Sequence, residues 1–299
     1  MNKKISVIIP TYNRKRTLMA CLRALNKQDF KKKDFEVLII DDGGEGDASE
    51  AIKKVEKEVE YELRFFERKH EGRAAVRNFG VKKAQGEIVI FIGDDIVISP
   101  FFLSTHFDFH RKSKKKNVAL VGYTTWHPQL RVDSFVHWLE NGGPLLDFRG
   151  LRDGKKTDFW HFYTGNLSCK REIFLEEKFD LSLSSYGWED IELGYRLTRK
   201  KNLEIYFSKK AIAYHWHQYN RSDFKNYARV IGSSAYSFQK KAPRLLVLPR
   251  GIKKIIFNFL ALISPILKPL KKEWYWYALF KKYFLEGIRG KASDSLLKE

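Results

Sequence analysis

The sequence predicts an α/β fold: a mostly parallel, Rossmann-like sheet with helices on both faces, followed by a C-terminal helical extension. Two observations carry this prediction. Short apolar runs typical of buried strands alternate with helical spacing over about the first hundred residues, and a basic, apolar segment without this alternation follows residue 220. With 299 residues, the chain is long enough for one large α/β domain or two small ones.

Strand-like and helix-like segments follow one another in a βαβαβ order in the first part of the chain. Residues 5–10, 35–40 and 88–92 are continuous apolar runs, as expected of strands buried on both faces of a sheet. Other segments are predicted from their spacing as helices (17–25, 48–60 and from 72) or strands (63–66 and 118–123). This order implies parallel strands joined by right-handed crossovers.

Polar side chains follow three of these strands at the points where the strands end. Ligands bind beyond the carboxyl ends of the strands in an open parallel sheet, so these side chains are predicted to line one ligand site. They come from three separate places in the sequence: Pro10, Thr11, Tyr12, Asn13 and Arg14; Asp41 and Asp42; and Asp94 and Asp95.

Asp94 and Asp95 are candidates for holding a divalent cation. Hard cations prefer oxygen ligands, and a cation that bridges two phosphates neutralises a diphosphate leaving group. An isolated Asp-Asp pair more often caps a turn. The second pair, Asp41 and Asp42, makes a functional site the better interpretation. These two can also accept hydrogen bonds from a base N–H or a ribose hydroxyl, while Gly43 serves either close ligand approach or only a tight turn.

Two further pairs of side chains are candidates for binding phosphate or metal. Arg73 and Arg77 lie near the start of a predicted helix, where they face either phosphate or solvent. His215 and His217 alternate along a predicted strand and so point to one face. His215 is the candidate metal ligand, and a structural histidine is the alternative.

Segment 187–197 places two acids in the first turn of a predicted amphipathic helix. Trp188 and Ile191 belong to its apolar face, and Glu189 and Asp190 open the helix. A carboxylate in that position can take the proton from a substrate hydroxyl that acts as a nucleophile. Capping of the helix N-terminus is the structural alternative.

The region after residue 220 is basic and apolar. Residues 221–299 contain 17 Lys and Arg but 5 Asp and Glu, so 17 − 5 = +12 of the net charge of +20 lies there. Residues 255–267 carry no charge, which is too short a run to span a membrane, since that takes about 20 apolar residues; Pro265 also interrupts it. The flanking lysines and the aromatic residues 274–277 favour a helix on an anionic membrane surface. Packing on the catalytic domain or on a second subunit is the alternative.

The remaining composition bears on localisation. Cys21 and Cys169 fit neither a disulfide framework nor a zinc site, which favours a reducing compartment. Met1 is followed almost directly by the first strand, with no room for a signal peptide. We therefore expect a cytoplasmic protein, peripheral on the inner face of the cell membrane. The positive charge mostly describes the tail and not the candidate active site. We expect no nucleic-acid partner.

Together these segments resemble family 2 glycosyltransferases, which share the GT-A fold. The resemblance extends over about residues 5–220. It rests on five segments that occur in the family's order: 6–14, 38–43, 72–78, 164–168 and the helix that begins with Glu189 and Asp190.

The resemblance implies an inverting transferase that moves a sugar from a nucleotide-diphosphate sugar, expected to be a UDP-sugar, to the hydroxyl of a saccharide or lipid-linked acceptor. Such reactions build cell-envelope or surface polysaccharides and glycolipids. By resemblance, Asp42 contacts the base, Asp95 binds Mn²⁺ or Mg²⁺, and Asp190 is the general base, with Glu189 beside it. The acceptor side is expected to include Thr164, Gly165, Asn166 and Trp188.

One departure from the family concerns the metal site. The usual Asp-x-Asp motif reads Gly93-Asp94-Asp95 here, so the first carboxylate is missing and the donor phosphates are expected to contribute more to metal binding. The resemblance also divides the chain into a catalytic domain, 1–220, and a basic helical region, 221–299. Within the catalytic domain, residues 1–98 would bind the donor and residues 99–220 the acceptor.

Two other functions are consistent with parts of the pattern. A nucleotidyltransferase also binds nucleotides on a parallel sheet, but it is expected to have a glycine-rich phosphate loop, and residues 11–14 contain no glycine. A non-enzymatic polyanion-binding protein would account for the charge. Its binding would be sensitive to salt and would survive the loss of Asp95 and Asp190.

Overall fold

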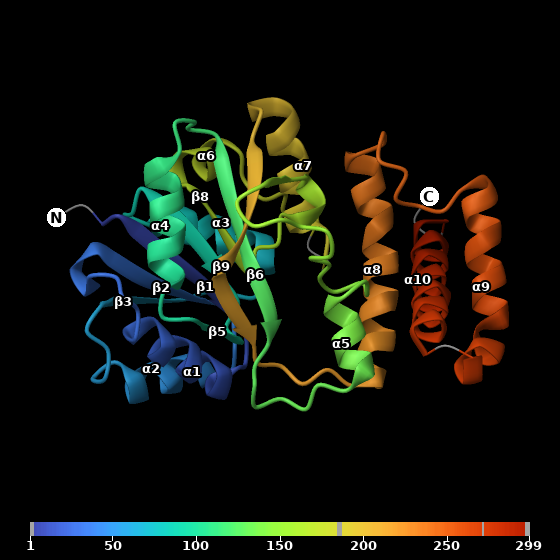
Figure 1. The fold of residues 1–299 in the computed structure, drawn as a ribbon, viewed down its shortest axis with the longest axis horizontal. Coiled ribbons are helices and arrows are strands. Elements are labelled where there is room, and N and C mark those ends of the chain that lie inside the picture. Colours follow the sequence, from blue (N-terminus) through green and yellow to red (C-terminus); the bar gives the residue numbers. More distant parts are fainter. Residues whose placement is uncertain (1–2, 184–186, 271, 297–299) are drawn as a thin grey trace. The chain divides into compact units, whose positions relative to one another are not determined.

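The computed structural model describes residues 3–183, 187–270 and 272–296 (Figure 1). The chain divides into two compact units. The first unit comprises Met1–Leu130, Gly150–Ser184 and Leu193–His217, and the second comprises Arg131–Arg149, Ser185–Glu192 and Gln218–Glu299. Each unit is therefore assembled from segments that are distant in the sequence.

The first unit is built on one sheet. Among the described residues it has nine strands in the order β3-β2-β1-β4-β8-β6-β9-β5, with β7 beside β9. The strands are β1 (Ile5–Thr11), β2 (Phe35–Asp41), β3 (Glu62–Glu67), β4 (Ile88–Ile92), β5 (Ile96–Ile98), β6 (Val118–Trp126), β7 (Lys156–Thr157), β8 (Asn166–Lys170) and β9 (Glu204–His215).

The predicted fold class is confirmed, and the parallel part of the sheet lies where the sequence predicted it. Strands β3, β2, β1 and β4 are parallel neighbours, with Ile5 opposite both Phe35 and Ile88. Beyond β4 the pairing is mixed. Strand β8 runs antiparallel to β4 and β6, β5 and β7 run antiparallel to β9, and only β6 and β9 are parallel. The periodicity of single segments did not predict this half, because pairing direction depends on the path of the chain between strands.

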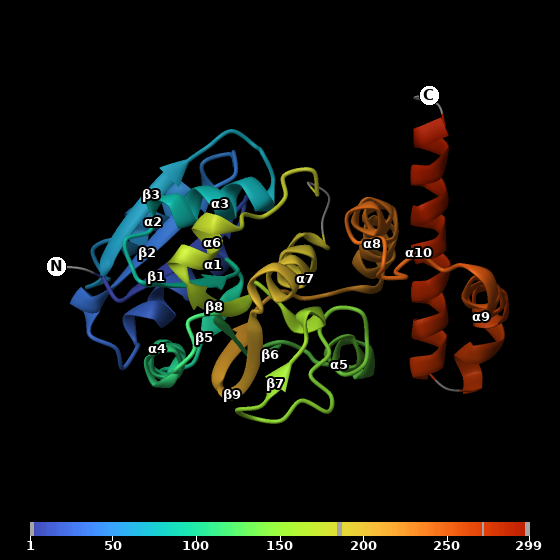
Figure 2. The same cartoon turned by 90° about the horizontal axis from the view of Figure 1, so that it is seen from above.

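Helices cover both faces of the sheet. Side chains of successive strand residues point to opposite faces, so strands that are apolar throughout need helices packed on both. Ile5, Val7 and Ile9 belong to one buried cluster with side chains of α1, α2 and α4. On the other face, α3 approaches Ile8 so closely that a Cβ atom on Gly80 would lie 2.6 Å from its Cγ2 atom; Figure 2 shows α3 beside α6. The bounds are α1 (Lys15–Asn26), α2 (Asp47–Val55), α3 (Arg73–Lys83), α4 (Phe102–Lys112), α6 (Arg171–Glu176) and α7 (Glu189–Lys201).

Two of these helices matter for the candidate site. Helix α1 follows β1 after the turn that contains Asn13, whose φ angle of 52° is in the left-handed region that asparagine tolerates. Helix α7 begins at Glu189, as predicted, so its first turn lies in the second unit and the rest in the first.

The second unit is helical. It contains α5 (Ser134–Glu140), α8 (Arg221–Lys241), α9 (Gly251–Leu270) and α10 (Lys272–Leu296). Helix α10 packs against α8, α9 and α5. Phe135, Trp138, Phe224 and Trp276 join α5, α8 and α10 in one aromatic cluster, with ring centroids 5.3–6.1 Å apart. No helix in the described ranges is long and apolar enough to cross a membrane.

Candidate active site

A pair of buried carboxylates follows β4 at the carboxyl edge of the sheet. Asp94 and Asp95 are each 9% exposed. The Thr11 hydroxyl, at the end of β1, donates to Asp94 Oδ2 at 2.8 Å. Arg14 forms an ion pair with Asp95, and its Nη1 atom lies 3.9 Å from Asp94 Oδ1. The parallel pairing of β1 and β4 therefore brings two of the predicted segments together.

His215 joins this pair from the end of β9. It stands opposite Ile96 where β9 pairs with β5, and its Nε2 atom lies 3.2 Å from Asp95 Oδ2. The backbone N–H of Trp216 donates to the Asp95 carbonyl at 2.7 Å. The Trp126 ring packs 5.4 Å from the His215 ring. His215, the candidate metal ligand of the sequence, thus lies beside Asp95; His217 lies beyond the end of β9, with its ring 6.2 Å from that of His215.

The surroundings shift the pKa values of the two carboxylates in opposite directions. Burial raises the pKa of Asp94 to about 6, and the adjacent charge of Asp95 contributes to the rise. Burial also acts to raise the pKa of Asp95. The contacts with His215 and Arg14 outweigh burial and hold that pKa below its ordinary value. Asp95 therefore ionises at a lower pH than Asp94.

The described residues include two candidates for holding a metal ion. They contain no cluster of three or more His, Cys, Asp or Glu side chains arranged to hold a metal ion. Asp95 and His215 do direct an oxygen and a nitrogen toward each other, which are ligand atoms that Mn²⁺ accepts. These residues fit a divalent cation that takes its other ligands from phosphate oxygens or water.

The loop after β2 is held by its own acids. Asp41 Oδ1 accepts a hydrogen bond from the Gly44 N–H at 3.0 Å, and burial raises the pKa of Asp41. Gly43 has a φ angle of 81°, and a Cβ atom there would lie 2.7 Å from the backbone nitrogen of His70. This glycine is therefore required by both backbone conformation and space. Asn13 Oδ1 accepts from the Glu45 N–H at 2.7 Å, which joins this loop to the end of β1.

Asp42 connects the same loop to the start of α3. Its carboxylate accepts hydrogen bonds from the backbone N–H groups of Glu71 and Gly72 at 2.8–3.2 Å. The His70 Nδ1 atom lies 3.1 Å from Asp42 Oδ2, and the His70 ring packs 5.1 Å from that of Tyr12, which is 49% exposed. The result is an aromatic surface beside a buried carboxylate.

Pro10 lies opposite Ile40, one residue before the end of β1.

The two predicted phosphate-side arginines differ. Arg73, the first residue of α3, is exposed. Asp95 and Asp94 raise the pKa of Arg14 against the effect of burial, and the charge of Arg73 acts weakly against this rise, so the two guanidinium groups are close enough to interact. Arg77 is buried, with its guanidinium 5.4 Å from the centre of the Phe179 ring. Arg73 is thus the better placed of the two for an anionic ligand.

The predicted acceptor segment at 164–166 is largely internal. Thr164 is 4% exposed and Asn166 is 1% exposed. The Asn166 side chain donates to the carbonyl of Ala211 at 2.9 Å and contacts His106 Nε2 at 3.1 Å. Gly165 faces open space, because an added Cβ would meet nothing within 4 Å.

The start of α7 is anchored within the second unit. The Trp188 indole N–H donates to the Ile231 carbonyl at 3.0 Å, and its ring stacks on Phe238 at 5.0 Å. Glu189 is 4% exposed and accepts from the Gly187 N–H at 2.9 Å. Asp190 is half-buried and accepts from the Ile191 N–H at 2.8 Å. Asp190 thus accepts from an N–H of the first turn of α7, whereas Glu189 contacts the backbone just before the helix.

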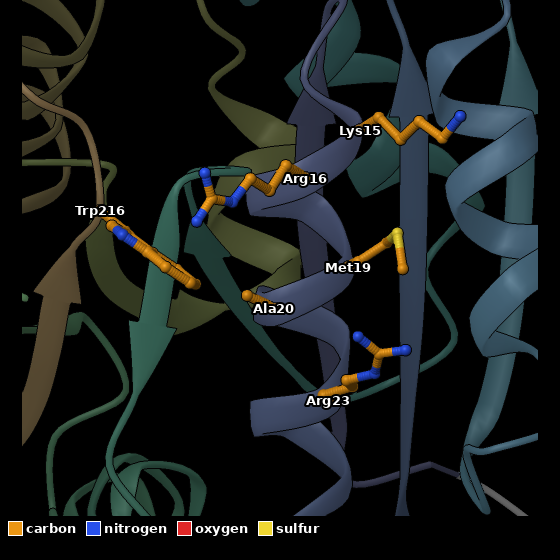
Figure 3. A pocket seen from close by; sticks show the side chains of 6 residues that line it. All are labelled: Lys15, Arg16, Met19, Ala20, Arg23 and Trp216. Carbon is orange, nitrogen blue, oxygen red and sulfur yellow. The ribbon is translucent and has the colours of Figure 1, made fainter. Parts of the chain in front are cut away.

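Several residues near the carboxylates were not predicted from the sequence. His70 and Trp126 carry no motif, although each is an aromatic or imidazole residue next to a predicted segment. A surface pocket also lies along α1, where the guanidinium of Arg16 faces the Trp216 ring at 5.6 Å (Figure 3). The pocket is lined by Lys15, Arg16, Met19, Ala20, Arg23 and Trp216.

Comparison with known proteins identifies the family. The family model described as "Glycosyl transferase family 2" matches residues 6–175, which include all of β1 except Ile5 and both acidic pairs. The chain belongs to glycosyl transferase family 2. The family 2 match contains four of the five segments on which the resemblance rests; the segment that begins at Glu189 lies beyond its end at residue 175.

Among curated relatives, an uncharacterized glycosyltransferase of Rickettsia conorii is 34% identical over 141 residues, which are 46% of this family 2 chain and 22% of the relative. Chondroitin synthase of Pasteurella multocida is 29% identical over 233 residues, 67% of the chain and 24% of the relative. The chain thus spans about a quarter or less of the length of these two relatives.

Solved structures share the fold. The mannosyltransferase PcManGT from Pyrobaculum calidifontis, in complex with GDP-Man and Mn²⁺, has a TM-score of 0.70 at 15% identity, covering 98% of this chain and 88% of that one. TarS 1–349 from S. aureus, in complex with UDP, has a TM-score of 0.55 at 17% identity, covering 99% and 92%. The family 2 chain therefore has the GT-A fold predicted from its sequence.

Proposed function

We propose that this family 2 chain transfers a sugar, with inversion, from a nucleotide-diphosphate sugar to an acceptor hydroxyl. The observation that carries the proposal is the convergence of Arg14, Asp94, Asp95 and His215 at the carboxyl edge of the sheet. An ionised carboxylate, an imidazole and a guanidinium beside one another are suited to a diphosphate and its cation. A sheet of this type binds ligands at that edge.

The donor would be held by three groups of residues. We assign the binding of the nucleotide base to the aromatic surface formed by Tyr12 and His70 and to Asp42. Asp42 also holds the loop before α3. Arg14 and Arg73 would bind phosphate oxygens, with Arg77 supporting α3 from beneath through Phe179. Asp95 and His215 would hold Mn²⁺ or Mg²⁺, which supplies positive charge to the departing diphosphate when bound. Thr11 fixes Asp94 in place beside them.

Asp190 is our candidate for the general base. In the proposed step the acceptor oxygen forms a bond to the anomeric carbon while the bond from that carbon to the diphosphate oxygen breaks. The hydroxyl proton passes to the Asp190 carboxylate, and the nucleoside diphosphate leaves. Glu189, through its hydrogen bond to the Gly187 N–H, would position the start of α7 rather than exchange protons.

The donor is proposed to be a UDP-sugar and the acceptor a saccharide or lipid-linked precursor of an envelope polymer. Support comes from the UDP in the TarS complex and from the name of chondroitin synthase. The GDP-Man bound to PcManGT makes a guanosine donor the alternative to test. On the acceptor side, the open space at Gly165 is the part of the 164–166 segment offered to a ligand, while Asn166 and Thr164 would shape it from within.

A donor screen with the Asp190→Asn variant tests this function. We expect the wild-type chain to bind one class of nucleotide sugar more tightly with Mn²⁺ or Mg²⁺ than with a chelator. Loss of a general base typically costs about 10²–10⁴-fold in rate, so Asp190→Asn should lose transfer while its nucleotide affinity is unchanged. Asp108→Asn, which changes an exposed carboxylate on α4, is the matched control. Retained turnover in Asp190→Asn would reject the base assignment, and salt-sensitive polyanion binding without nucleotide-sugar binding would reject the enzyme.

A further inference from the structure

Helix α9 exposes a continuous apolar surface. Six large apolar side chains on this helix are 49–77% exposed. They are Ile252, Ile255, Ile256, Phe259, Leu262 and Ile266. With 100° between successive helical residues, these six lie within an arc of about 120° along the whole helix. None of the six side chains can form a hydrogen bond. A face of this kind on a water-soluble helix marks an interaction site.

This face is distinct from the one that attaches α9 to the rest of its unit. Phe257 and Ser264 are buried, and they lie on the opposite side of the helix from the exposed arc. The Lys281 ammonium of α10 lies 4.4 Å from the centre of the Phe257 ring, and Arg289 of α10 donates to Asn258 at 3.1 Å. Helix α9 is therefore apolar on two sides, and α10 covers only one of them.

The charge around α9 has a single sign. Between Asp223 and Glu273 the sequence contains no acidic residue but eleven Lys and Arg. Exposed cations stand at both ends of the uncharged run, with Lys254 before it and Lys268 and Lys272 after it. Two copies of such a face would bring like charges together, which disfavours self-association. An anionic partner is complementary to it.

The chemistry of the face favours lipid over protein. Protein partners typically meet aromatic residues and arginine at the core of an interface, with hydrogen bonds across it. The exposed arc of α9 is almost wholly aliphatic. Tryptophan and tyrosine, which are enriched at the level of lipid headgroups, stand just after α9: Trp274 is 55% exposed and Tyr277 is 39% exposed.

We propose that α9 lies in the interface of an anionic phospholipid membrane, with its exposed aliphatic arc among the acyl chains and the flanking lysines at the headgroups. The helix lies on the membrane surface and does not cross the bilayer, because α10 covers one of its faces and only the opposite face is exposed. This inference goes beyond the proposed function and does not depend on it. It gives the sequence-based expectation of a membrane surface a defined set of residues.

Vesicle co-sedimentation of the full chain tests the proposal. We expect binding to vesicles of equal parts phosphatidylglycerol and phosphatidylcholine, and little binding to pure phosphatidylcholine. The double variant Phe259→Glu/Leu262→Glu should lower the affinity at least about tenfold, because buried acyl contact drives interfacial binding. Leu181→Glu changes an apolar residue that is 60% exposed on the first unit, and it should bind like the wild type. Lys254→Glu/Lys268→Glu should remove the preference for the anionic vesicles.

Three further measurements decide against other interpretations. Circular dichroism of the Phe259→Glu/Leu262→Glu variant should match the wild type, because both side chains are exposed. Light scattering that shows a wild-type dimer and a monomeric variant would assign the face to a second copy and overturn the proposal. A wild-type chain that binds neither kind of vesicle would also overturn it. Release of nucleotide from the donor, measured without vesicles, should be equal in the variant and the wild type. Absence of that release in both, with vesicle binding retained, would reject the proposed function and leave this inference intact.

Discussion

His215 Nε2 lies 3.2 Å from Asp95 Oδ2, so the last residue of β9 contacts an acid that follows β4 at the edge of the sheet. The contact depends on the antiparallel pairing of β9 with β5, which sets His215 opposite Ile96. If these two side chains hold the cation of a glycosyltransferase, they should act together on metal-dependent donor binding.

The first prediction concerns this pair. His215→Ala should weaken Mn²⁺-dependent binding of the donor by about 10–100-fold, the range seen when metal-site partners are removed. Asp95→Asn should weaken it further, because the charged ligand is lost. Titration calorimetry with the donor, with Mn²⁺ and with a chelator, measures both effects. His137→Ala, on an exposed position of α5, should bind as the wild type does. Equal loss of donor affinity in the presence of chelator would show that His215 acts on the fold instead.

The second prediction concerns Gly93, which replaces the first acid of the family's usual motif. A Cβ atom at this position would lie 2.8 Å from Asp95 Oδ1. Gly93→Ala should therefore push the carboxylate away from Arg14 and His215 and lower metal-dependent donor affinity by about tenfold or more. Gly290→Ala is the control, because an added Cβ there meets nothing within 4 Å. Unchanged donor affinity in Gly93→Ala would show that the Asp95 orientation does not matter.

The third prediction concerns the aromatic surface formed by Tyr12 and His70, whose rings are 5.1 Å apart. Stacking of a base on an aromatic ring contributes about 1–3 kcal/mol. Tyr12→Ala should accordingly lower the affinity for free UDP by about 5- to 150-fold, and Tyr12→Phe should retain it because the ring remains. Fluorescence or calorimetric titration with UDP distinguishes the two variants. Loss of affinity in both would point to the hydroxyl rather than to the ring.

The fourth prediction concerns stability at acid pH. His106 is fully buried, where it contacts Ser168 Oγ at 2.8 Å and Asn166 Oδ1 at 3.1 Å, and burial lowers its pKa to about 4. The unfolded chain binds this proton at a pKa of about 6.5, so stability is fully present above that pH and is lost as the pH falls through about 6.5 to 4. The change for this one residue is about 3 kcal/mol in the free energy of unfolding.

Urea unfolding between pH 7 and 4 measures this effect. Replacing His106 by Gln removes the titrating group, so the variant should be less stable than the wild type at pH 7 but should lose less stability on acidification. His137→Ala, at an exposed site, should follow the wild-type curve. A His106→Gln variant with the wild-type pH dependence would show that other groups control acid unfolding.

The local elements could be predicted from the sequence because each depends on residues close together in the chain. The apolar runs 5–10, 35–40 and 88–92 correspond to β1, β2 and β4, and the acids after β2 and β4 follow directly from those strand ends. The first turn of α7 was predicted for the same reason. The order of these motifs was sufficient to recognise the family.

The pairings between distant segments could not be predicted in this way. The buried network of Asn166 with His106 and the Ala211 carbonyl depends on the places of α4, β8 and β9, so the sequence offered Asn166 as an acceptor contact although it is 1% exposed. Trp188 likewise carries an apolar helical pattern, but its partners, Ile231 and Phe238, come from α8.

By itself, the sequence determined the fold class, the family and the identity of the acids at the strand ends, because strand burial and helix starts are encoded over a few neighbouring residues. Only the tertiary structure decided that His215 and Arg14 both reach Asp95, that Asp42 holds the loop before α3, and that α9 leaves one apolar face uncovered. These outcomes depend on which segments pack together. Packing is a property of the whole chain, because each contact requires the surfaces and paths of two distant segments to match.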